Sequence, residues 1–497
     1  MQNNSTQRHH RADLARIATH VMAERGLQPE FPAEALRQLG NISGPANEPD
    51  SQIRDLTHML WCSIDNDDSE DLDQLTACEV LPNQGKGGVV KIFVAIADVD
   101  ALVKKDTPID QHAQANTTSV YTSARIFPML PERLCTDLSS LNAHVDRLAV
   151  VTEMVFNADA SLAGATVYRA KVRNQAKLAY DALSDWIDGK GALPAAAAAV
   201  PGMEAQLRTQ DSVAQQLRAR RRAEGSLEFE TFQPRAVFDG EQVVDIRQQV
   251  QNRGRQLIEE VMIATNGCTA RFLAAQGGAS LRRVVRSPER WLRIVGVAKE
   301  YGEVLPPEPD SKALEAFLAR RRKADPLRFP DLSLVIVKLM GRGEYVVETP
   351  GGLPVGHFGL AVRDYTHSTA PNRRYPDLIT SRMVKALLAK QAPPYANAEL
   401  GALAEHCTRQ EDAAQKVERQ MRKSEAALVL ESRIGQYFDG VVTGASPQGV
   451  WVRVFAPPAE GKVVTTTAGL GVGDKIRVKL ISTNVERGFI DFALVKN

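Results

Sequence analysis

Residues 63–74 read Ser-Ile-Asp-Asn-Asp-Asp-Ser-Glu-Asp-Leu-Asp-Gln, and the interpretation of the whole chain starts from them. This stretch places six carboxylates within nine residues, directly after an apolar, strand-like segment at 58–62. Two carboxylates about 4 Å apart repel each other by roughly 4 kcal/mol at an effective dielectric constant of 20. If several of them converge, protons, solvent or a cation must relieve the repulsion.

Three interpretations of this acidic stretch compete. The first is a solvated turn, because Asp, Asn and Ser favour turns. The second is an EF-hand calcium loop, which fails because Glu70 stands where the sharp-turn glycine is needed and Thr76 where the bidentate glutamate is needed. The third is a site for Mg²⁺ or Mn²⁺ beside a core sheet. The buried-strand pattern of residues 89–98 favours this third interpretation.

Three ordered blocks of the sequence resemble the ribonuclease II/R (RNB) family of exoribonucleases. The first is Ile64-Asp65 followed by Asp71-Leu72-Asp73, which is similar to the family motif Ile-Asp-(x)5-Asp-x-Asp-Asp. The other blocks are residues 118–121 with 128–132, and residues 356–377. The resemblance extends over roughly residues 59–432. It implies an α/β (α+β) RNB catalytic domain.

The resemblance also implies the catalytic groups. Asp65, Asp71 and Asp73 match the metal-binding carboxylates, and Arg373 matches the arginine that contacts the scissile phosphate and stabilises its developing charge. Gln74 stands where the family has a fourth Asp. Glutamine keeps an oxygen donor but loses the charge, so we expect one metal ion to be held less tightly.

Residues that grip RNA are implied in the same way. An aromatic clamp accepts any base because every base has a π-face, and a contact to the ribose 2′-hydroxyl distinguishes RNA from DNA. The matched RNA-binding residues are Tyr121 and Phe229 for the clamp, Tyr180 and Glu259 for the ribose, Glu418 on a late helix, and Arg374 beside the catalytic arginine. Since metal-bound water needs no histidine base, we expect His357 and His367 to be structural.

The function implied by the resemblance is a processive 3′→5′ exoribonuclease acting on single-stranded RNA. It would use Mg²⁺, with Mn²⁺ as an alternative, in a two-metal-ion mechanism that releases nucleoside 5′-monophosphates. The substitution at Gln74 leaves a second interpretation open. This is a catalytically impaired RNA-binding protein that keeps the RNB channel. We expect a monomer in either case.

The chain divides into three expected domains. Residues 1–57 predict two short helices, which leaves open a helix-turn-helix-like contact to nucleic acid or a structural cap. Residues 58–432 form the catalytic domain, with strands at 89–97, 148–156 and 165–172, helices at 203–223, 256–275 and 398–432, and a linker at 189–201. Family members usually carry one or two cold-shock domains ahead of it, and residues 1–57 cannot hold two.

Residues 433–497 predict an OB-fold barrel of the ribosomal-protein type. In residues 450–455 the period of two places three valines on one face and Trp451, Arg453 and Phe455 on the other. We expect Trp451 and Arg453 to bind RNA, because aromatic and arginine side chains on an exposed strand form a stacking platform. The alternative is a strand that a neighbouring domain covers.

Composition sets wider bounds. The 497 residues carry a formal net charge of +1, which averages the acids at 65–73 with arginine-rich runs at 218–222, 320–323 and 373–374. A nuclease needs such opposite patches, although each run can also be a solvated helix face. The five cysteines form no CxxC pair, so neither a zinc site nor a disulfide framework is indicated, and we expect a reducing cytoplasm. The sequence has no apolar run of 18 residues, so no membrane segment is expected.

Overall fold

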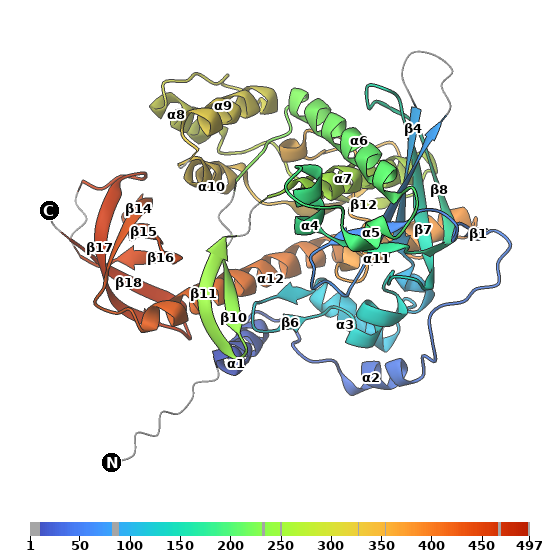
Figure 1. The fold of residues 1–497 in the computed structure, drawn as a ribbon, viewed down its shortest axis with the longest axis horizontal. Coiled ribbons are helices and arrows are strands. Elements are labelled where there is room, and N and C mark those ends of the chain that lie inside the picture. The colour runs from blue at the N-terminus through green and yellow to red at the C-terminus, as the bar shows by residue number, and fades with distance from the viewer. Residues whose placement is uncertain are drawn as a thin grey trace.

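The computed structural model describes residues 10–81, 89–230, 234–248, 251–326, 328–352, 354–465 and 469–495. Figure 1 shows a large α/β part and a small β-barrel formed by the C-terminal strands. The long helix α12 (Asn397–Glu431) packs against elements of both parts and connects them. The predicted α/β fold with a separate C-terminal barrel is therefore confirmed.

A seven-stranded sheet forms the centre of the α/β part. In spatial order its strands are β1 (Arg54–Asp55), β8 (Leu162–Arg173), β7 (Asp146–Phe156), β4 (Val89–Ala97), β3 (Gln74–Leu81), β2 (Cys62–Asp65) and β9 (Ala176–Ala179). The outer pairs β1·β8 and β2·β9 are parallel, and the inner pairs are antiparallel. The three predicted strands correspond to β4, β7 and β8.

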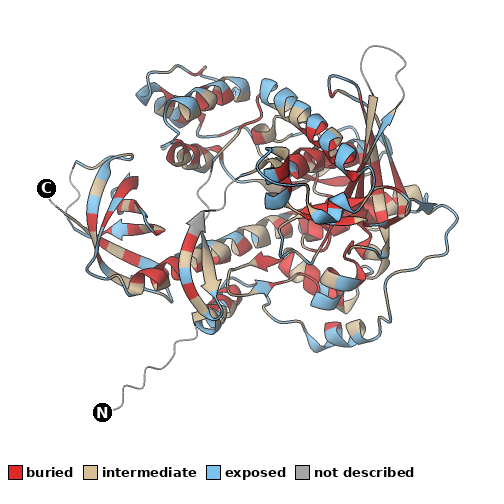
Figure 2. Cartoon of the chain, in the orientation of Figure 1, coloured by how far each residue is buried: buried red, intermediate tan, exposed pale blue. Residues whose placement is uncertain are grey.

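Both faces of this sheet are buried. In β4, Ile92, Val94 and Ile96 join one hydrophobic cluster, and Phe93 and Ala95 join the other, because successive side chains of a strand point to opposite faces. Helices α4 (Tyr180–Ile187), α5 (Ala195–Ala198), α6 (Met203–Ala223) and α7 (Arg253–Ala275) cover the first face, and α3 (Pro108–Asn116), α11 (Tyr375–Leu388) and the start of α12 cover the second. Figure 2 shows the buried residues along these strands and helices.

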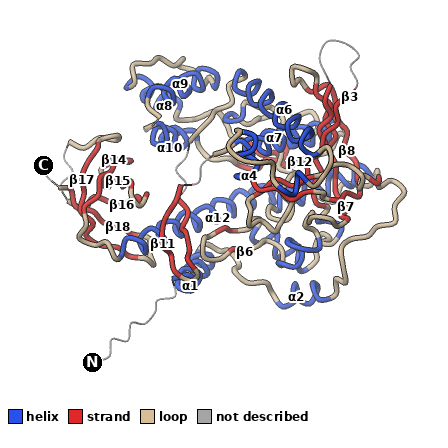
Figure 3. The backbone as a smooth tube through the Cα atoms, in the orientation of Figure 1, coloured by secondary structure: helices blue, strands red, loops and turns tan. Residues whose placement is uncertain are grey.

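Several elements were not predicted from the sequence. They include the helices α8 (Trp291–Glu300), α9 (Ser311–Ala324) and α10 (Phe329–Met340). They also include the hairpins β5–β6 (Val120–Tyr121, Ile126–Phe127), β10–β11 (Pro234–Asp239, Gln242–Gln248) and β12–β13 (Ser280–Val284, Glu344–Glu348), and the short turns η1 (Val99–Ala101), η2 (Arg133–Leu138) and η3 (Phe358–Leu360). Helices α8–α10 have a hydrophobic core of their own. Figure 3 shows the β10–β11 hairpin beside α12, and the hairpin contacts β16 (Pro458–Val463) of the barrel.

The two N-terminal helices pack against different parts of the molecule. Helix α1 (His10–Glu24) packs on α12, and its buried face joins the cluster that also contains the barrel core. Helix α2 (Ala33–Gly40) packs on α3 and joins the core of the sheet. Figure 1 shows the two helices apart from each other. A helix-turn-helix needs its two helices in contact, so this packing favours the structural alternative.

The C-terminal barrel is closed by five strands. In spatial order they are β14 (Tyr437–Ser446), β15 (Gly449–Phe455), β16 (Pro458–Val463), β18 (Phe489–Leu494) and β17 (Lys475–Asn484). Val450, Val452 and Val454 are buried inside it, as their alternation predicts. Among the described helices of the whole chain, none combines the length and the apolar character that crossing a membrane requires.

Candidate active site

The acidic stretch leaves the sheet between two neighbouring strands. Asp65 is the last residue of β2, and Gln74 is the first residue of β3, where it pairs with Ile96. The intervening turn is anchored by Ser140, whose hydroxyl accepts a hydrogen bond from the Leu72 amide at 3.0 Å and donates one to the Glu70 carbonyl at 2.7 Å. The six carboxylates are therefore presented by a turn that is fixed between the end of β2 and the start of β3.

Asp73 and Arg373 meet at this turn. The backbone amide of Asn372 donates to Oδ1 of Asp73 at 2.9 Å, and Nε of Arg373 lies 3.4 Å from Oδ2 of the same carboxylate. The amide of Ser119 donates to the Arg373 carbonyl at 3.0 Å, which ties a third segment to this loop. Asp73 is only 1% exposed. Residues about 300 positions apart, which the sequence predicts to meet, are thus in contact.

The charges in this cluster disturb one another. Burial raises the pKa of Asp73 to about 8, with Arg373 opposing the rise and Asp71 adding to it. Burial also raises the pKa of Asp71, against the attraction of Arg373, and the Asp65 carboxylate adds repulsion. The hydroxyl of Tyr121 donates to Oδ2 of Asp71 at 3.2 Å. Because desolvation disfavours the ionised carboxylates, a bound cation would stabilise them strongly.

These groups fit a hard divalent cation by their chemistry. Oδ2 of Asp73 is buried and makes no hydrogen bond, and carboxylate oxygens are the donors that Mg²⁺ and Mn²⁺ prefer. In the described residues, however, no three His, Cys, Asp or Glu side chains already converge as a ready ligand set. Asp65 instead accepts hydrogen bonds from the Asn66 amide at 2.7 Å and the Ser69 hydroxyl at 2.8 Å. A cation bound to Oδ1 of Asp65 would compete with these two hydrogen bonds.

Tyr121 is held in place by helix α12. Its backbone amide donates to Glu418 at 3.1 Å, and two residues later the Ser123 amide and hydroxyl donate to Glu425 at 3.4 Å and 3.1 Å. Burial raises the pKa of Glu418, and it raises that of Glu425 to about 7. Two carboxylates seven positions apart on one helix thus fix the strand that carries Tyr121. Glu425 has no place in the sequence motif, so only the structure identifies it.

Comparison with protein families agrees with this geometry. Residues 53–390 match the RNB domain, and residues 436–495 match the RNase II-type exonuclease C-terminal S1 domain. The chain belongs to the RNB family. It is 30% identical over 511 residues to ribonuclease R of Vibrio cholerae, a match that covers 94% of this chain and 60% of that protein. The chain therefore spans about three-fifths of the length of the curated relatives it matches.

Solved structures share the fold of this RNB chain. Mycoplasma genitalium RNase R in complex with ribose-methylated single-stranded RNA superposes with a TM-score of 0.87 at 21% identity, covering 97% of this chain and 78% of that one. Yeast Ssd1, described as a pseudonuclease, superposes with a TM-score of 0.68 at 16% identity, covering 93% of this chain and 57% of that one. At these identities the similarity establishes the fold alone.

A second group of residues flanks Asp65 in this RNB domain. Tyr180 begins α4 and feels the charges of Asp65, Arg255 and Arg373, while burial raises its pKa. The Arg255 guanidinium lies 4.5 Å from the Tyr180 ring centre and donates to Oδ1 of Asn66 at 2.8 Å. Arg255 thus links α7 to both Tyr180 and the acidic turn. The sequence motif did not single out Arg255, because its partners lie in distant segments.

The remaining predicted contacts are placed less directly. Phe229 packs against the core of α8–α10, and Glu259 accepts a hydrogen bond from Nε2 of Gln251 at 3.0 Å. Burial and the neighbouring Glu260 raise the pKa of Glu259. Glu259 follows Arg255 by one turn of α7, so both face the same side of the helix. The pairing of Phe229 with Tyr121 stays a prediction.

Arg374 has a structural partner in the described chain. Its Nε and Nη2 atoms donate to the two oxygens of Asp377 at 2.9 Å and 2.7 Å, and Oδ1 of Asp377 also accepts from the amides of Thr369 and Ala370 at 2.8 Å each. This ion pair shapes the loop that presents Arg373. The predicted contact of Arg374 to RNA stays untested, and the geometry favours a positioning role.

Both histidines of the matched block make internal hydrogen bonds, as predicted. Nδ1 of His357 accepts from the Leu360 amide at 3.1 Å, and Nδ1 of His367 lies 2.8 Å from the Tyr345 hydroxyl. Burial lowers the pKa of His357 to about 4 and lowers that of His367 as well. The two rings are therefore neutral structural groups.

The two long arginine runs are engaged by acidic side chains. Arg221 pairs with Glu260 at 2.6 Å, Arg222 lies 3.5 Å from Glu315, and Arg320 pairs with Glu303. Arg218 and Arg322 both pair with Glu228, next to Phe229. These pairs fasten the end of α6 to α7 and α9, and they fasten the loop after α6 to α6 and α9. These ion pairs therefore do not support the prediction that the arginine runs form an open positive surface for RNA phosphates.

The expected stacking platform on β15 is partly covered. The Arg453 guanidinium pairs with both oxygens of Asp331 on α10, at 2.9 Å and 3.0 Å, and the two side chains are only 12% and 8% exposed. Trp451 is half-buried. Arg453 thus docks the barrel onto the helical cluster, which is the covered-strand alternative. An RNA contact by Trp451 stays a prediction.

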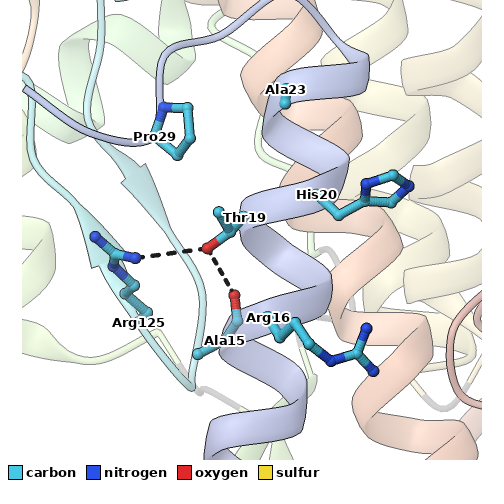
Figure 4. Close-up of a pocket in the computed structure, with 7 residues that line it drawn as sticks. All are labelled: Ala15, Arg16, Thr19, His20, Ala23, Pro29 and Arg125. Carbon is cyan, nitrogen blue, oxygen red and sulfur yellow. Dashed lines mark hydrogen bonds between the residues drawn. The ribbon is translucent and has the colours of Figure 1, made fainter.

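One surface pocket lies away from the acidic site, between α1 and the β5–β6 hairpin (Figure 4). Its volume is about 550 Å³, and its lining residues are Ala15, Arg16, Thr19, His20, Ala23, Pro29 and Arg125. Arg125 also pairs with Glu30 at 2.8 Å. The pocket includes none of the predicted site residues.

Proposed function

We propose that this RNB protein is a processive 3′→5′ exoribonuclease that hydrolyses single-stranded RNA to nucleoside 5′-monophosphates by a two-metal-ion mechanism with Mg²⁺, or Mn²⁺. The observation that carries the proposal is the buried pairing of Asp73 with the Asn372 amide and Arg373 at the acidic turn. The relatives named ribonuclease R support it, as does the related structure that holds single-stranded RNA.

The acidic residues take the metal-binding role in this proposal. Asp65, Asp71 and Asp73, with Gln74 as a neutral donor, would hold the divalent cations. When bound, these cations neutralise phosphoryl charge and lower the pKa of water. Arg373 stabilises the charge that develops on the scissile phosphate, and the amide of Asn372 keeps Asp73 oriented toward that guanidinium. The Tyr121 hydroxyl fixes Asp71 in the same way.

The aromatic residues provide the grip. Tyr121 stacks on the 3′-terminal base, opposed by Phe229, and its backbone is set by Glu418. Tyr180 and Glu259 approach the ribose, where the 2′-hydroxyl distinguishes RNA from DNA. Arg255 holds Tyr180 beside Asp65. This arrangement accepts any base sequence, which suits processive degradation.

A second candidate is an RNA-binding protein with impaired catalysis. Two observations favour it: Gln74 replaces an acidic residue of the family motif, and the described carboxylates form no ready three-ligand set. The pseudonuclease Ssd1 shares this fold. The intact pairing of Asp73 with Arg373 makes the enzyme the better-supported candidate.

We further propose that the protein works as a cytoplasmic monomer with three divisions. Residues 58–432 carry catalysis, residues 433–497 bind RNA, and residues 1–57 brace the two against each other through α1 and α2. Sedimentation of the full chain with and without RNA tests the monomer.

The function is tested with 5′-labelled RNA and DNA of one sequence, each incubated with Mg²⁺, Mn²⁺ or chelator. The enzyme predicts progressive shortening of RNA alone, dependence on the metal, and release of nucleoside 5′-monophosphates. Binding of RNA without shortening at millimolar metal supports the second candidate instead. Absence of both binding and shortening contradicts both.

A further inference from the structure

A solvent-exposed aromatic residue lies on the β14–β17 face of the barrel. Tyr437, the first residue of β14, is 55% exposed. Nζ of Lys479 lies 5.7 Å from its ring centre, and the guanidinium carbon of Arg477 lies 5.9 Å from it. Tyr437 is thus an exposed ring with two cations of β17 close to it.

Strand register produces this arrangement. Tyr437 pairs directly with Lys479, and Asp439 pairs with Arg477, so alternate residues of β14 and β17 share the outer face. Lys475 is exposed at the start of β17. The same paired positions include one acidic side chain, Asp439, which lies 3.9 Å from Arg477. Both side chains are exposed. Among these paired positions, three cations stand against one carboxylate, which favours an anionic ligand.

The arginine on β15 is arranged differently from the cations on β17. There, Arg453 is buried in an ion pair with Asp331, so its charge is neutralised by the protein itself. On β14–β17 the cations and the ring remain accessible to a ligand. The face suited to a polyanion is therefore not the one that the alternation of residues 450–455 singles out.

We propose that Tyr437, Arg477 and Lys479 form a binding site for single-stranded RNA, on which a base stacks while the cations meet the flanking phosphates. Exposed aromatic rings bordered by basic residues bind single strands in this way. The site engages RNA upstream of the 3′ end that enters the acidic site. This placement rests on the proposed function. A protein or a membrane is a different partner, and the test below separates it.

The test uses the full chain in chelator and fluorescence anisotropy with a 5′-labelled single-stranded RNA of about 30 nucleotides, since OB folds engage about 4 to 16 nucleotides. Tyr437→Ala should weaken binding about tenfold, and Tyr437→Phe should restore it because the ring is kept. Phe489→Ala is the matched control, since Phe489 is a barrel aromatic with 56% exposure. It should bind like the unaltered protein.

Charge is tested separately. The double variant Arg477→Gln with Lys479→Gln should reduce the slope of log affinity against log salt concentration by about 1.4, or about 0.7 for each lost cation. With metal present, Tyr437→Ala should raise KM for the long RNA and leave KM for an RNA of about five nucleotides unchanged, with kcat constant.

The outcomes distinguish this inference from the proposed function. If Tyr437→Ala binds the long RNA as Phe489→Ala does, the inference is overturned and the face belongs to another class of partner, while exonuclease activity can still be present. If the unaltered protein shortens no RNA but Tyr437→Ala weakens its binding, the proposed function fails and the inference stands.

Discussion

The acidic site and the β14–β17 face of the barrel hold charges in opposite ways. At the acidic site Asp73 is buried, and its partners come from segments that lie far apart in the sequence. On the barrel the cations are exposed beside Tyr437, and their neighbours lie across a single strand pair. Burial makes the first site sensitive to the position of every atom, whereas exposure makes the second tolerant. Under the two proposals, the first site acts on one phosphodiester bond and the second holds RNA of any sequence.

The largest expected effect follows from removing the buried charge. Asp73→Asn should lower the rate of RNA shortening by roughly a thousandfold, because it removes a negative ligand and the partner of Arg373. Asp67→Asn, at an exposed acid of the same turn, is the control and should keep activity. Both are compared by single-turnover shortening of labelled RNA. Activity of the Asp73 variant above a tenth of normal would place catalysis elsewhere.

The neighbouring arginines should separate chemistry from architecture. Arg373→Gln should lower kcat about a hundredfold and cost less thermal stability than Arg374→Gln, because the partly exposed Arg373 makes a single 3.4 Å contact with Asp73 rather than two short hydrogen bonds. Arg374→Gln should instead lower the melting temperature, because it leaves the buried Asp377 without its ion-pair partner. Kinetics and thermal unfolding of both variants check this. Equal loss of stability in the two would contradict the division.

This division also shows how much could be predicted from the sequence. The motif predicted the meeting of Asp73 with Arg373, which the structure contains, and Asp65 lies near enough to Asp71 to help raise its pKa. Long periodic segments such as 203–223 were predicted to the residue, since the helical pattern is strong there. The β14–β17 face of the barrel was not predicted as a binding face. Alternation assigns side chains to the two faces of a strand but does not identify which face a distant residue covers.

Arg453 illustrates this limit. Its partner Asp331 lies 122 positions earlier on α10, a helix that the sequence did not predict. The contacts of Arg255 and Glu425 were not predicted for the same reason, since they join one element to another. Motifs record local chemistry, whereas pairing between segments depends on packing.

Helix α12 connects the two regions, and its buried residue Glu425 makes the stability of the fold depend on pH. Burial raises the pKa of Glu425 from its ordinary 4.5 to about 7, so between these values the folded chain binds a proton that the unfolded chain does not. This group's stabilising contribution is therefore present at low pH and is lost as the pH rises from about 4.5 to about 7.

Glu425→Gln removes that loss and keeps an acceptor for Ser123. Relative to the unaltered chain, the variant should gain on the order of 3 kcal/mol of unfolding free energy on going from about pH 4.5 to above pH 7. Urea unfolding at about pH 5 and about pH 8 measures the difference. Parallel pH profiles for the two proteins would show that folding does not raise the pKa of Glu425.

The smallest of these effects concerns Gln74, where the acidic site departs from its family motif. Gln74→Asp restores a carboxylate next to Asp73, so it should lower the metal concentration needed for half-maximal rate by about tenfold, as expected when one charged ligand is added at partial screening. Gln74→Asn, which keeps a neutral donor, is the matched control and should not lower it. Metal titration monitored by calorimetry in the absence of RNA reports the same affinity without depending on activity. If the requirement is unchanged or higher in the Asp variant, Gln74 does not contact the second ion. The groups that compete with the metal would then be Asn66 and Ser69, through the hydrogen bonds that they make to Asp65.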